Sequence, residues 1–175
     1  RRVLFRSGCG GKSSVRAGER QPRETDKEFE RTRVSGTALF RNGEYRKAVK
    51  EFSAGAEKAG KAGEWLWQGR MLANEGGAYM MLGENRPAIR RLLAARTAAE
   101  KAGDLLTLQG VEGNLASVYV LTGDYEAAAA AAGRGAPIRP PKETPEYRTR
   151  TLIAFGRAMA KARGDRKSTR LNSSH

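Results

Sequence analysis

The sequence of 175 residues predicts an all-α fold: an α-solenoid built from three helix–turn–helix units and a truncated fourth. Three observations predict this fold. Similar residues recur every 40 positions, apolar residues follow helical spacing within each unit, and a glycine separates the two helices of a unit. A single helix pair cannot bury its apolar faces alone, so neighbouring units are expected to stack.

The 40-residue repeat is defined by the alanines of the second helices, Ala48, Ala88 and Ala128. Twelve residues before each alanine stands a small residue, nine before it a large apolar residue, and five before it a glycine. These columns are Gly36, Gly76 and Ala116; Leu39, Tyr79 and Tyr119; and Gly43, Gly83 and Gly123. One more period reaches Gly156, where we expect the fourth unit.

This order of small, large, glycine and aromatic residues resembles the tetratricopeptide repeat, here over residues 24–164. The resemblance implies a right-handed α-solenoid, and the period is that of the family's longer-period branch, since the usual period is about 34 residues. HEAT or armadillo arrays, with periods of about 40–47 residues, are the competing interpretation. The columns G-x₂-Y and G-x-Y-x₂-A favour the tetratricopeptide repeat, although Asn85 replaces the aromatic residue and Ala132 stands where Phe52 and Leu92 stand earlier.

Helix boundaries follow from caps and breakers. Thr25 and Glu28 have the spacing of a capping box, and Pro87 is tolerated near a helix start because no partner is needed for its missing N–H. The expected elements are a helix from Thr25 to Arg41, a helix from Tyr45 to a loop at Lys58–Glu64, helices Trp65–Leu82 and Pro87–Lys101, a helix capped by Asp104 and ending at Leu121, a helix Tyr125–Ala132, a Pro-rich connection Gly133–Pro145, and a last helix from Thr144 or Thr149 to Arg163.

Two further features concern packing. Trp65 and Trp67 are two positions apart, so they point to different helix faces, and we expect Trp65 to pack between units. Glycines inside the expected helices cost up to ~1 kcal/mol each where they are exposed. These glycines are Gly69, Gly76, Gly77, Gly110 and Gly113.

The two ends differ from the repeat region. Residues 1–7 and 165–175 resemble the translation of a common sequencing adapter and its reverse complement. We therefore expect residues 1–23 to be an adapter-derived start plus a flexible Gly/Ser-rich leader, and 165–175 an adapter-derived disordered tail. The chain is then a fragment cut on both sides. The alternative is that both ends are natural disordered tails.

The charge balance argues against a nucleic-acid partner once the ends are set aside. The full chain has a net charge of +14, but residues 8–164 hold 27 basic and 18 acidic residues, a net charge of +9, scattered over helix surfaces. No run of 18 apolar residues is present, so we expect no transmembrane segment.

Cys9 is the only cysteine, which excludes an intrachain disulfide. Cys9 and the polar residues after it resemble the start of a mature bacterial lipoprotein, which makes Cys9 a candidate lipidation site. The alternative is an incidental exposed cysteine in the leader. For the location of the protein, the cytoplasm is favoured, and lipid anchoring at Cys9 is the alternative.

No catalytic constellation is recognisable. The only histidine, His175, lies in the adapter-like tail, so the rest of the chain lacks the ligand of usual zinc sites and the base of a His-containing triad. The carboxylates lie on expected exposed faces or caps. We expect no enzyme activity, no metal and no cofactor.

The first helix of each unit lines the concave surface of such a solenoid, and the resemblance assigns the ligand-facing positions. These are Arg33, Val34, Thr37 and Arg41; Ala73, Asn74, Gly77 and Met81; Gly113, Asn114, Ser117 and Leu121; and Ile153, Ala154, Arg157 and Lys161. Arg70 adds a further cation. Asn74 and Asn114 share one column, and in peptide-binding members asparagine there bonds the ligand. The alternative is that both only solvate the groove.

Together these features predict a protein-interaction scaffold whose partner is a protein or peptide with an acidic or C-terminal segment, because Arg33, Arg41, Arg70, Arg157 and Lys161 make the groove basic. The phrases LFRNGEY and NLASVYVLTGDYEAA also resemble repeat arrays attached to caspase-like CHAT domains of bacteria. The alternatives are therefore a regulatory or substrate-recognition arm of a CHAT-type peptidase, or of a bacterial transcriptional regulator.

Overall fold

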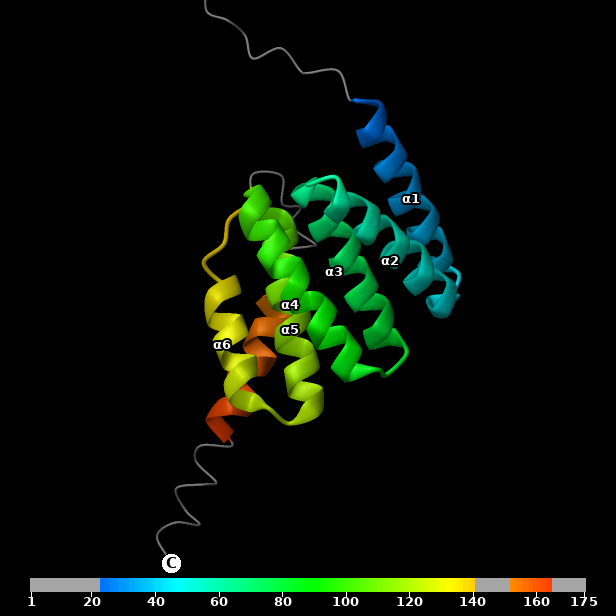
Figure 1. Cartoon of the computed structure of the whole chain (residues 1–175). Coiled ribbons are helices and arrows are strands. Elements are labelled where there is room, and N and C mark those ends of the chain that lie inside the picture. The colour runs from blue at the N-terminus through cyan, green and yellow to red at the C-terminus, as the bar shows by residue number, and fades with distance from the viewer. Residues whose placement is uncertain (1–22, 141–151, 165–175) are drawn as a thin grey trace, which may run out of the picture.

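The computed structural model describes residues 23–140 and 152–164, and all the regular structure in these two ranges is helical (Figure 1). The all-α fold class is confirmed. The candidate lipidation site Cys9, the leader, both adapter-like ends and the predicted helix starts Thr144 and Thr149 lie outside the described residues. The helices are α1 (Glu24–Arg41), α2 (Tyr45–Lys61), α3 (Trp65–Met81), α4 (Asn85–Ala102), α5 (Leu105–Thr122), α6 (Tyr125–Gly135) and a helix over 152–164.

The helices form a repeat array. Each of α1 to α5 packs against the next helix in the chain, and α3 also contacts α1 and α5. The first helices of successive units therefore lie next to one another in one layer. That layer is the one in which the sequence places the binding residues.

The same type of turn joins each pair of consecutive helices from α1 to α6. Each turn contains a glycine with φ between 65° and 79°, a backbone conformation that residues with a side chain rarely adopt. The next residue is an acid, whose N–H donates to the carbonyl five residues earlier at 2.9–3.0 Å, and this bond satisfies a carbonyl at the helix end. The glycines are Gly43, Gly63, Gly83, Gly103 and Gly123, spaced by 20 residues.

The structure corrects several predicted boundaries. The prediction of a loop over Lys58–Glu64 is wrong, because α2 continues to Lys61 and only a short turn around Gly63 follows it. Gly60 lies inside the helix, where a Cβ atom would meet Gln68 Nε2 at 2.4 Å, so it is a packing residue rather than a breaker. α4 begins at Asn85 rather than Pro87, and α6 extends past Ala132 to Gly135.

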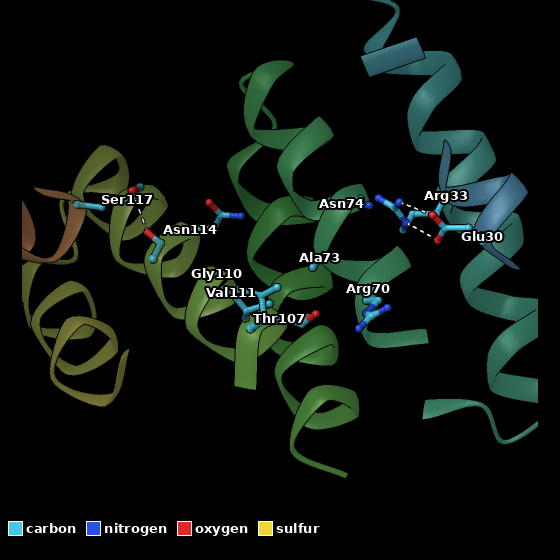
Figure 2. Close-up of a pocket in the computed structure, with 13 residues that line it drawn as sticks. Glu30, Arg33, Arg70, Ala73, Asn74, Thr107, Gly110, Val111, Asn114 and Ser117 are labelled. Atoms are coloured by element: carbon cyan, nitrogen blue, oxygen red, sulfur yellow. Dashed lines mark hydrogen bonds and ion pairs between the residues drawn. The ribbon is translucent and has the colours of Figure 1, made fainter. Parts of the chain in front are cut away.

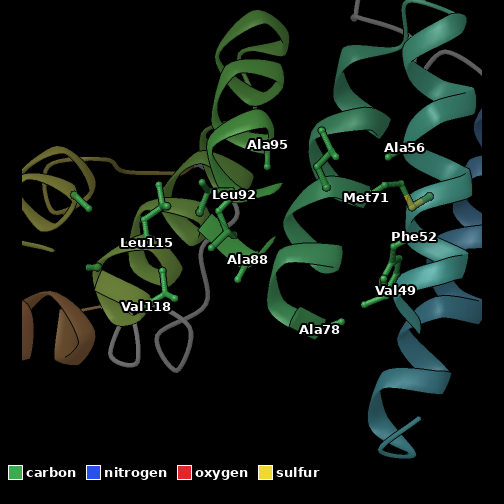
Figure 3. Close-up of a cluster of buried hydrophobic side chains, with 14 of the residues drawn as sticks. Val49, Phe52, Ala56, Met71, Ala78, Ala88, Leu92, Ala95, Leu115 and Val118 are labelled. Atoms are coloured by element: carbon green, nitrogen blue, oxygen red, sulfur yellow. The ribbon is translucent and has the colours of Figure 1, made fainter. Parts of the chain in front are cut away.

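The core explains the column of small residues (Figure 3). A Cβ atom on Gly36 would meet the Phe52 ring at 2.5 Å, and one on Gly76 would meet Leu92 Cγ at 2.7 Å. Glycine thus makes room for a large residue of the second helix, 16 positions later. In the third unit the small column holds Ala116 instead of glycine, and the facing position holds Ala132 instead of a large residue. Both alanines are buried, so the smaller side chain at 132 leaves room for the methyl group at 116.

The start of α1 differs from the predicted capping box. The N-cap is Arg23, not Thr25, and its N–H donates to Asp26 Oδ2 at 3.1 Å. Asp26 also accepts a hydrogen bond from Trp67 Nε1 at 2.8 Å, which ties α1 to α3. Trp67 is buried, while Trp65, the tryptophan expected to pack between units, is 40% exposed, with Lys101 Nζ 4.1 Å from its ring centroid.

This contact predicts an acid-sensitive link between α1 and α3. Hydrogen bonds from Arg23 and Trp67 lower the pKa of Asp26 to about 2 from an ordinary 3.8. A lowered pKa in the folded state means that the ionised carboxylate stabilises the fold above pH 3.8, and that this contribution is lost as the pH falls towards 2. We expect Asp26→Asn to lower the thermal midpoint at pH 7, with a difference from wild type that shrinks between pH 4 and pH 2.

Circular dichroism melts across this pH range measure the effect. Glu24→Gln, which removes an exposed carboxylate from the same turn, is the control and should change the midpoint little. If the thermal midpoint of Asp26→Asn stays below that of the wild type by the same amount from pH 7 to pH 2, the ionised Asp26 carboxylate does not stabilise the fold as assigned.

The helix over 152–164 is joined to the array through Phe155, Ala158 and Ala162, which are buried. Three apolar side chains of this helix, Leu152, Ile153 and Met159, are exposed. Among the described residues nothing lies within 4 Å of a Cβ atom built on Gly156, in contrast to Gly36 and Gly76. The fourth unit thus contributes a first helix with no second helix packed on it in the described part of the chain.

Candidate binding groove

A groove of about 660 Å³ runs across α1, α3 and α5 (Figure 2). Every described residue that lines it, except Ala154 of the last helix, belongs to the first helix of one of the three complete units. The lining residues are Glu30, Arg33, Arg70, Ala73, Asn74, Leu106, Thr107, Gly110, Val111, Gly113, Asn114, Ser117 and Ala154.

Small residues create this space. Ala73 of α3, Gly110 and Gly113 of α5, and Ala154 present at most a methyl group to the groove. Larger side chains at these positions would fill it. The glycines of α5, which cost helix stability, therefore also shape the groove.

The two asparagines of the repeat column both line the groove. Asn74 on α3 and Asn114 on α5 are half-buried, and neither side chain has a hydrogen-bond partner among the described residues. Each amide has two N–H donors and an acceptor oxygen, which match the N–H and C=O groups of an extended peptide. Within the described part of the chain, these amides are therefore available to a ligand.

An ion pair occupies the α1 side of the groove. Arg33 Nη2 and Nε donate to the two carboxylate oxygens of Glu30 at 2.6 and 2.8 Å, a two-bond geometry that strengthens the pair (Figure 2). Hydrogen bonding to Arg33 lowers the pKa of Glu30 against the effect of burial, and the charge of Arg70 lowers it further. Glu30 therefore remains ionised and neutralises Arg33 at neutral pH.

A second ion pair connects α3 to the start of α5. Arg70 Nε donates to Asp104 Oδ2 at 2.9 Å, and the guanidinium lies 5.5 Å from the Trp67 ring centroid. Asp104 caps α5 by accepting from the Thr107 N–H and hydroxyl. Burial raises the pKa of Asp104, but Arg70 and Thr107 outweigh it and the net shift is downward. Arg70 is thus also neutralised within the protein.

The structure brings part of the predicted site together. Arg33, Arg70, Asn74, Asn114 and Ser117 line the groove, and so do Ala73, Gly113 and Ala154. The Ser117 hydroxyl donates to the Gly113 carbonyl at 2.9 Å, so it faces a ligand as an acceptor. The remaining predicted residues lie outside the lining: Val34, Thr37, Arg41, Gly77, Met81, Leu121, Ile153, Arg157 and Lys161.

Most of those outlying residues are still accessible. Met81 and Leu121 occupy equivalent positions at the ends of α3 and α5 and are 54% and 67% exposed. Arg41, Arg157 and Lys161 are exposed, and no ion pair involves them in the described part of the chain. The Thr37 hydroxyl, in contrast, donates to the Arg33 carbonyl at 2.7 Å, which is a hydrogen bond within α1.

Several groove residues were not predicted, namely Glu30, Leu106, Thr107, Gly110 and Val111. The signal for Glu30 was available, because it stands three residues before Arg33 and so shares its helix face. Thr107, Gly110 and Val111 lie within the two turns that precede Gly113, where the predicted stretch of α5 begins. The groove therefore extends further towards the start of α5 than the family positions indicate.

The buried carboxylates elsewhere are structural. Glu112 accepts two bonds from Arg134, and Arg91 lies 2.9 Å from Glu75, whose pKa is raised by burial against the opposing effects of Arg91 and Ser53. In residues 23–140 and 152–164, no three His, Cys, Asp or Glu side chains are grouped so as to hold a metal ion. None of the described helices is both long and apolar enough to cross a membrane.

Comparison of the chain with models of known protein families, with curated proteins and with solved structures gave no match. The class of the protein therefore comes from its own geometry. It is an all-α helical repeat array, with a groove across the first helices of its units.

Proposed function

We propose that this chain is a tetratricopeptide-like protein-interaction scaffold that binds an extended peptide segment of a partner protein in the groove across α1, α3 and α5. The observation that carries the proposal is the pair Asn74 and Asn114. These two amides have no hydrogen-bond partner among the described residues, and they stand at equivalent positions, 40 residues apart in the sequence. The groove that they line crosses three helices. An extended peptide offers backbone groups along such a path.

The proposed ligand is a partner segment, acidic or C-terminal, as the sequence predicts. The cations Arg41, Arg157 and Lys161 support this character, since no described carboxylate pairs with them. Arg33 and Arg70 support it less, because each is already paired inside the protein. The exposed Met81 and Leu121 add apolar contacts beyond the groove.

The test uses linear peptides of about ten residues, which span about 33 Å when extended. A random library displayed on phage is selected on the full chain, and the best peptides are synthesised. We expect Asn74→Ala with Asn114→Ala to weaken their binding roughly 10- to 30-fold, since each amide contributes about 1 kcal/mol. Fluorescence anisotropy measures the dissociation constants.

Asn85→Ala is the matched control, because Asn85 lies at the start of α4 and outside the groove. Its affinity should equal that of the wild type. Selected peptides that bind the double variant and the wild type equally well would rule out the groove as the binding site.

A further inference from the structure

The charged side chains of the groove form an alternating series. Arg33 pairs with Glu30 at 2.6 Å on α1, Glu30 lies within the electrostatic reach of Arg70, and Arg70 pairs with Asp104 at 2.9 Å. Glu30, Arg33 and Arg70 are the charged residues that line the described groove, and Asp104 is the direct partner of Arg70. The four charges sum to zero.

Glu30 is the acidic member of this series that a ligand meets. Its side chain is 45% exposed and that of Arg33 is 34% exposed, whereas that of Asp104 is only 8% exposed. An acidic ligand must displace Glu30 from Arg33 and also approach a like charge, which is unfavourable in a partly desolvated groove. A segment with both signs of charge can place its base near Glu30 and its acid near Arg33.

We infer that Glu30 is a specificity-determining residue, and that the groove takes partner segments carrying acidic and basic side chains in near-equal number while excluding purely acidic ones. This inference rests on the proposed function, and for the segment that enters the groove it replaces the acidic preference stated there with a preference for mixed charge. It assigns to Glu30 the role of repelling the wrong ligand, in addition to its ion pair with Arg33.

The test repeats the selection from the same phage library on three variants. Glu30→Gln removes the negative charge and leaves Arg33 free, and Arg33→Gln leaves Glu30 unpaired. Glu57→Gln is the matched control, because it removes the same charge from an exposed helical pair, with Lys61 on α2, outside the groove. Circular dichroism melts show whether each variant is folded.

We expect the wild type and Glu57→Gln to select peptides whose net charge is close to zero. Glu30→Gln should select acidic peptides and bind them about tenfold more tightly than the wild type does. Arg33→Gln should shift the selection towards basic peptides. The affinity of Glu30→Gln for acidic peptides should also fall as salt is added, more steeply than that of the wild type for its own peptides.

Purely acidic peptides selected by the wild type, or an unchanged selection by Glu30→Gln and Arg33→Gln, would overturn the inference while the proposed function stands. A library that yields no peptide dependent on Asn74 and Asn114 overturns both. If either charge variant fails to fold, the selection by the wild type and by the other variant still decides between these outcomes.

Discussion

Replacing Arg134 with leucine is expected to lower the free energy of unfolding by about 3 kcal/mol. Arg134 donates from Nε and Nη2 to the two oxygens of Glu112 at 3.0 Å each, and Glu112 is 1% exposed. The substitution leaves a buried carboxylate whose remaining ion-pair partner among the described residues is Arg96, at 3.8 Å. Loss of the partner of a buried charge is costly because that charge stays desolvated. The 47% exposure of the Arg134 side chain and the presence of Arg96 keep the cost at the low end of the usual range.

The double variant Arg134→Leu with Glu112→Leu separates the ion pair from the general role of these positions. With both charges removed, no buried charge remains, so we expect most of the lost stability to return. Arg86→Leu is the surface control: Arg86 is exposed near the start of α4, and a change within about 0.5 kcal/mol is expected. Urea unfolding gives the three free energies.

A double variant as unstable as Arg134→Leu would show that the arginine acts through its packing rather than through Glu112. A change below about 1 kcal/mol for Arg134→Leu alone would show that Arg96 or water compensates the carboxylate. Both results contradict the assignment of Glu112 as a buried charge that depends on Arg134.

The 40-residue period was readable from the sequence because the columns have simple steric causes. The glycines of the small column face Phe52 and Leu92, and the turn glycines at 43, 83 and 123 have positive φ. The sequence does not show which of Gly60 and Gly63 forms the equivalent turn, because both glycines are typical helix breakers. In the structure α2 continues through Gly60 to Lys61, and Gln68 packs against Gly60.

The candidate site was partly predictable for a similar reason. Helical spacing places Arg33, Asn74 and Asn114 on the first-helix face, and the structure finds all three in the groove. Whether a cation is free depends on which acid it meets, and Asp104 is 34 residues from Arg70. That pairing follows from the stacking of α3 against α5, so the sequence overestimates the positive charge of the groove.

The neighbouring glycines of α3 should respond to alanine in opposite directions. At Gly76 a Cβ atom would lie 2.7 Å from Leu92 Cγ and 2.8 Å from its Cδ2, so either the buried Leu92 or the two helices must move. Such overpacking costs about 1–3 kcal/mol, which exceeds the gain in helix propensity of up to ~1 kcal/mol. We expect Gly76→Ala to be destabilising by about 1–2 kcal/mol.

At Gly77, in contrast, nothing described lies within 4 Å of the added Cβ atom, so only the helix propensity changes. We expect Gly77→Ala to stabilise the protein by up to ~1 kcal/mol. The pair is closely matched, because both residues lie in α3 and the same methyl group is added. Urea unfolding of the two variants measures both changes.

The close approach of α3 and α4 can be tested further by shortening the residue that Gly76 faces. Leu92→Ala alone should be destabilising by about 2–5 kcal/mol, because it leaves a cavity. In the Leu92→Ala background the methyl group of Gly76→Ala no longer meets Leu92, so the second substitution should become neutral or stabilising. The third unit already has alanine at both positions, Ala116 and Ala132. If Gly76→Ala is equally destabilising with and without Leu92, its cost does not arise from this contact, and the small column has another cause.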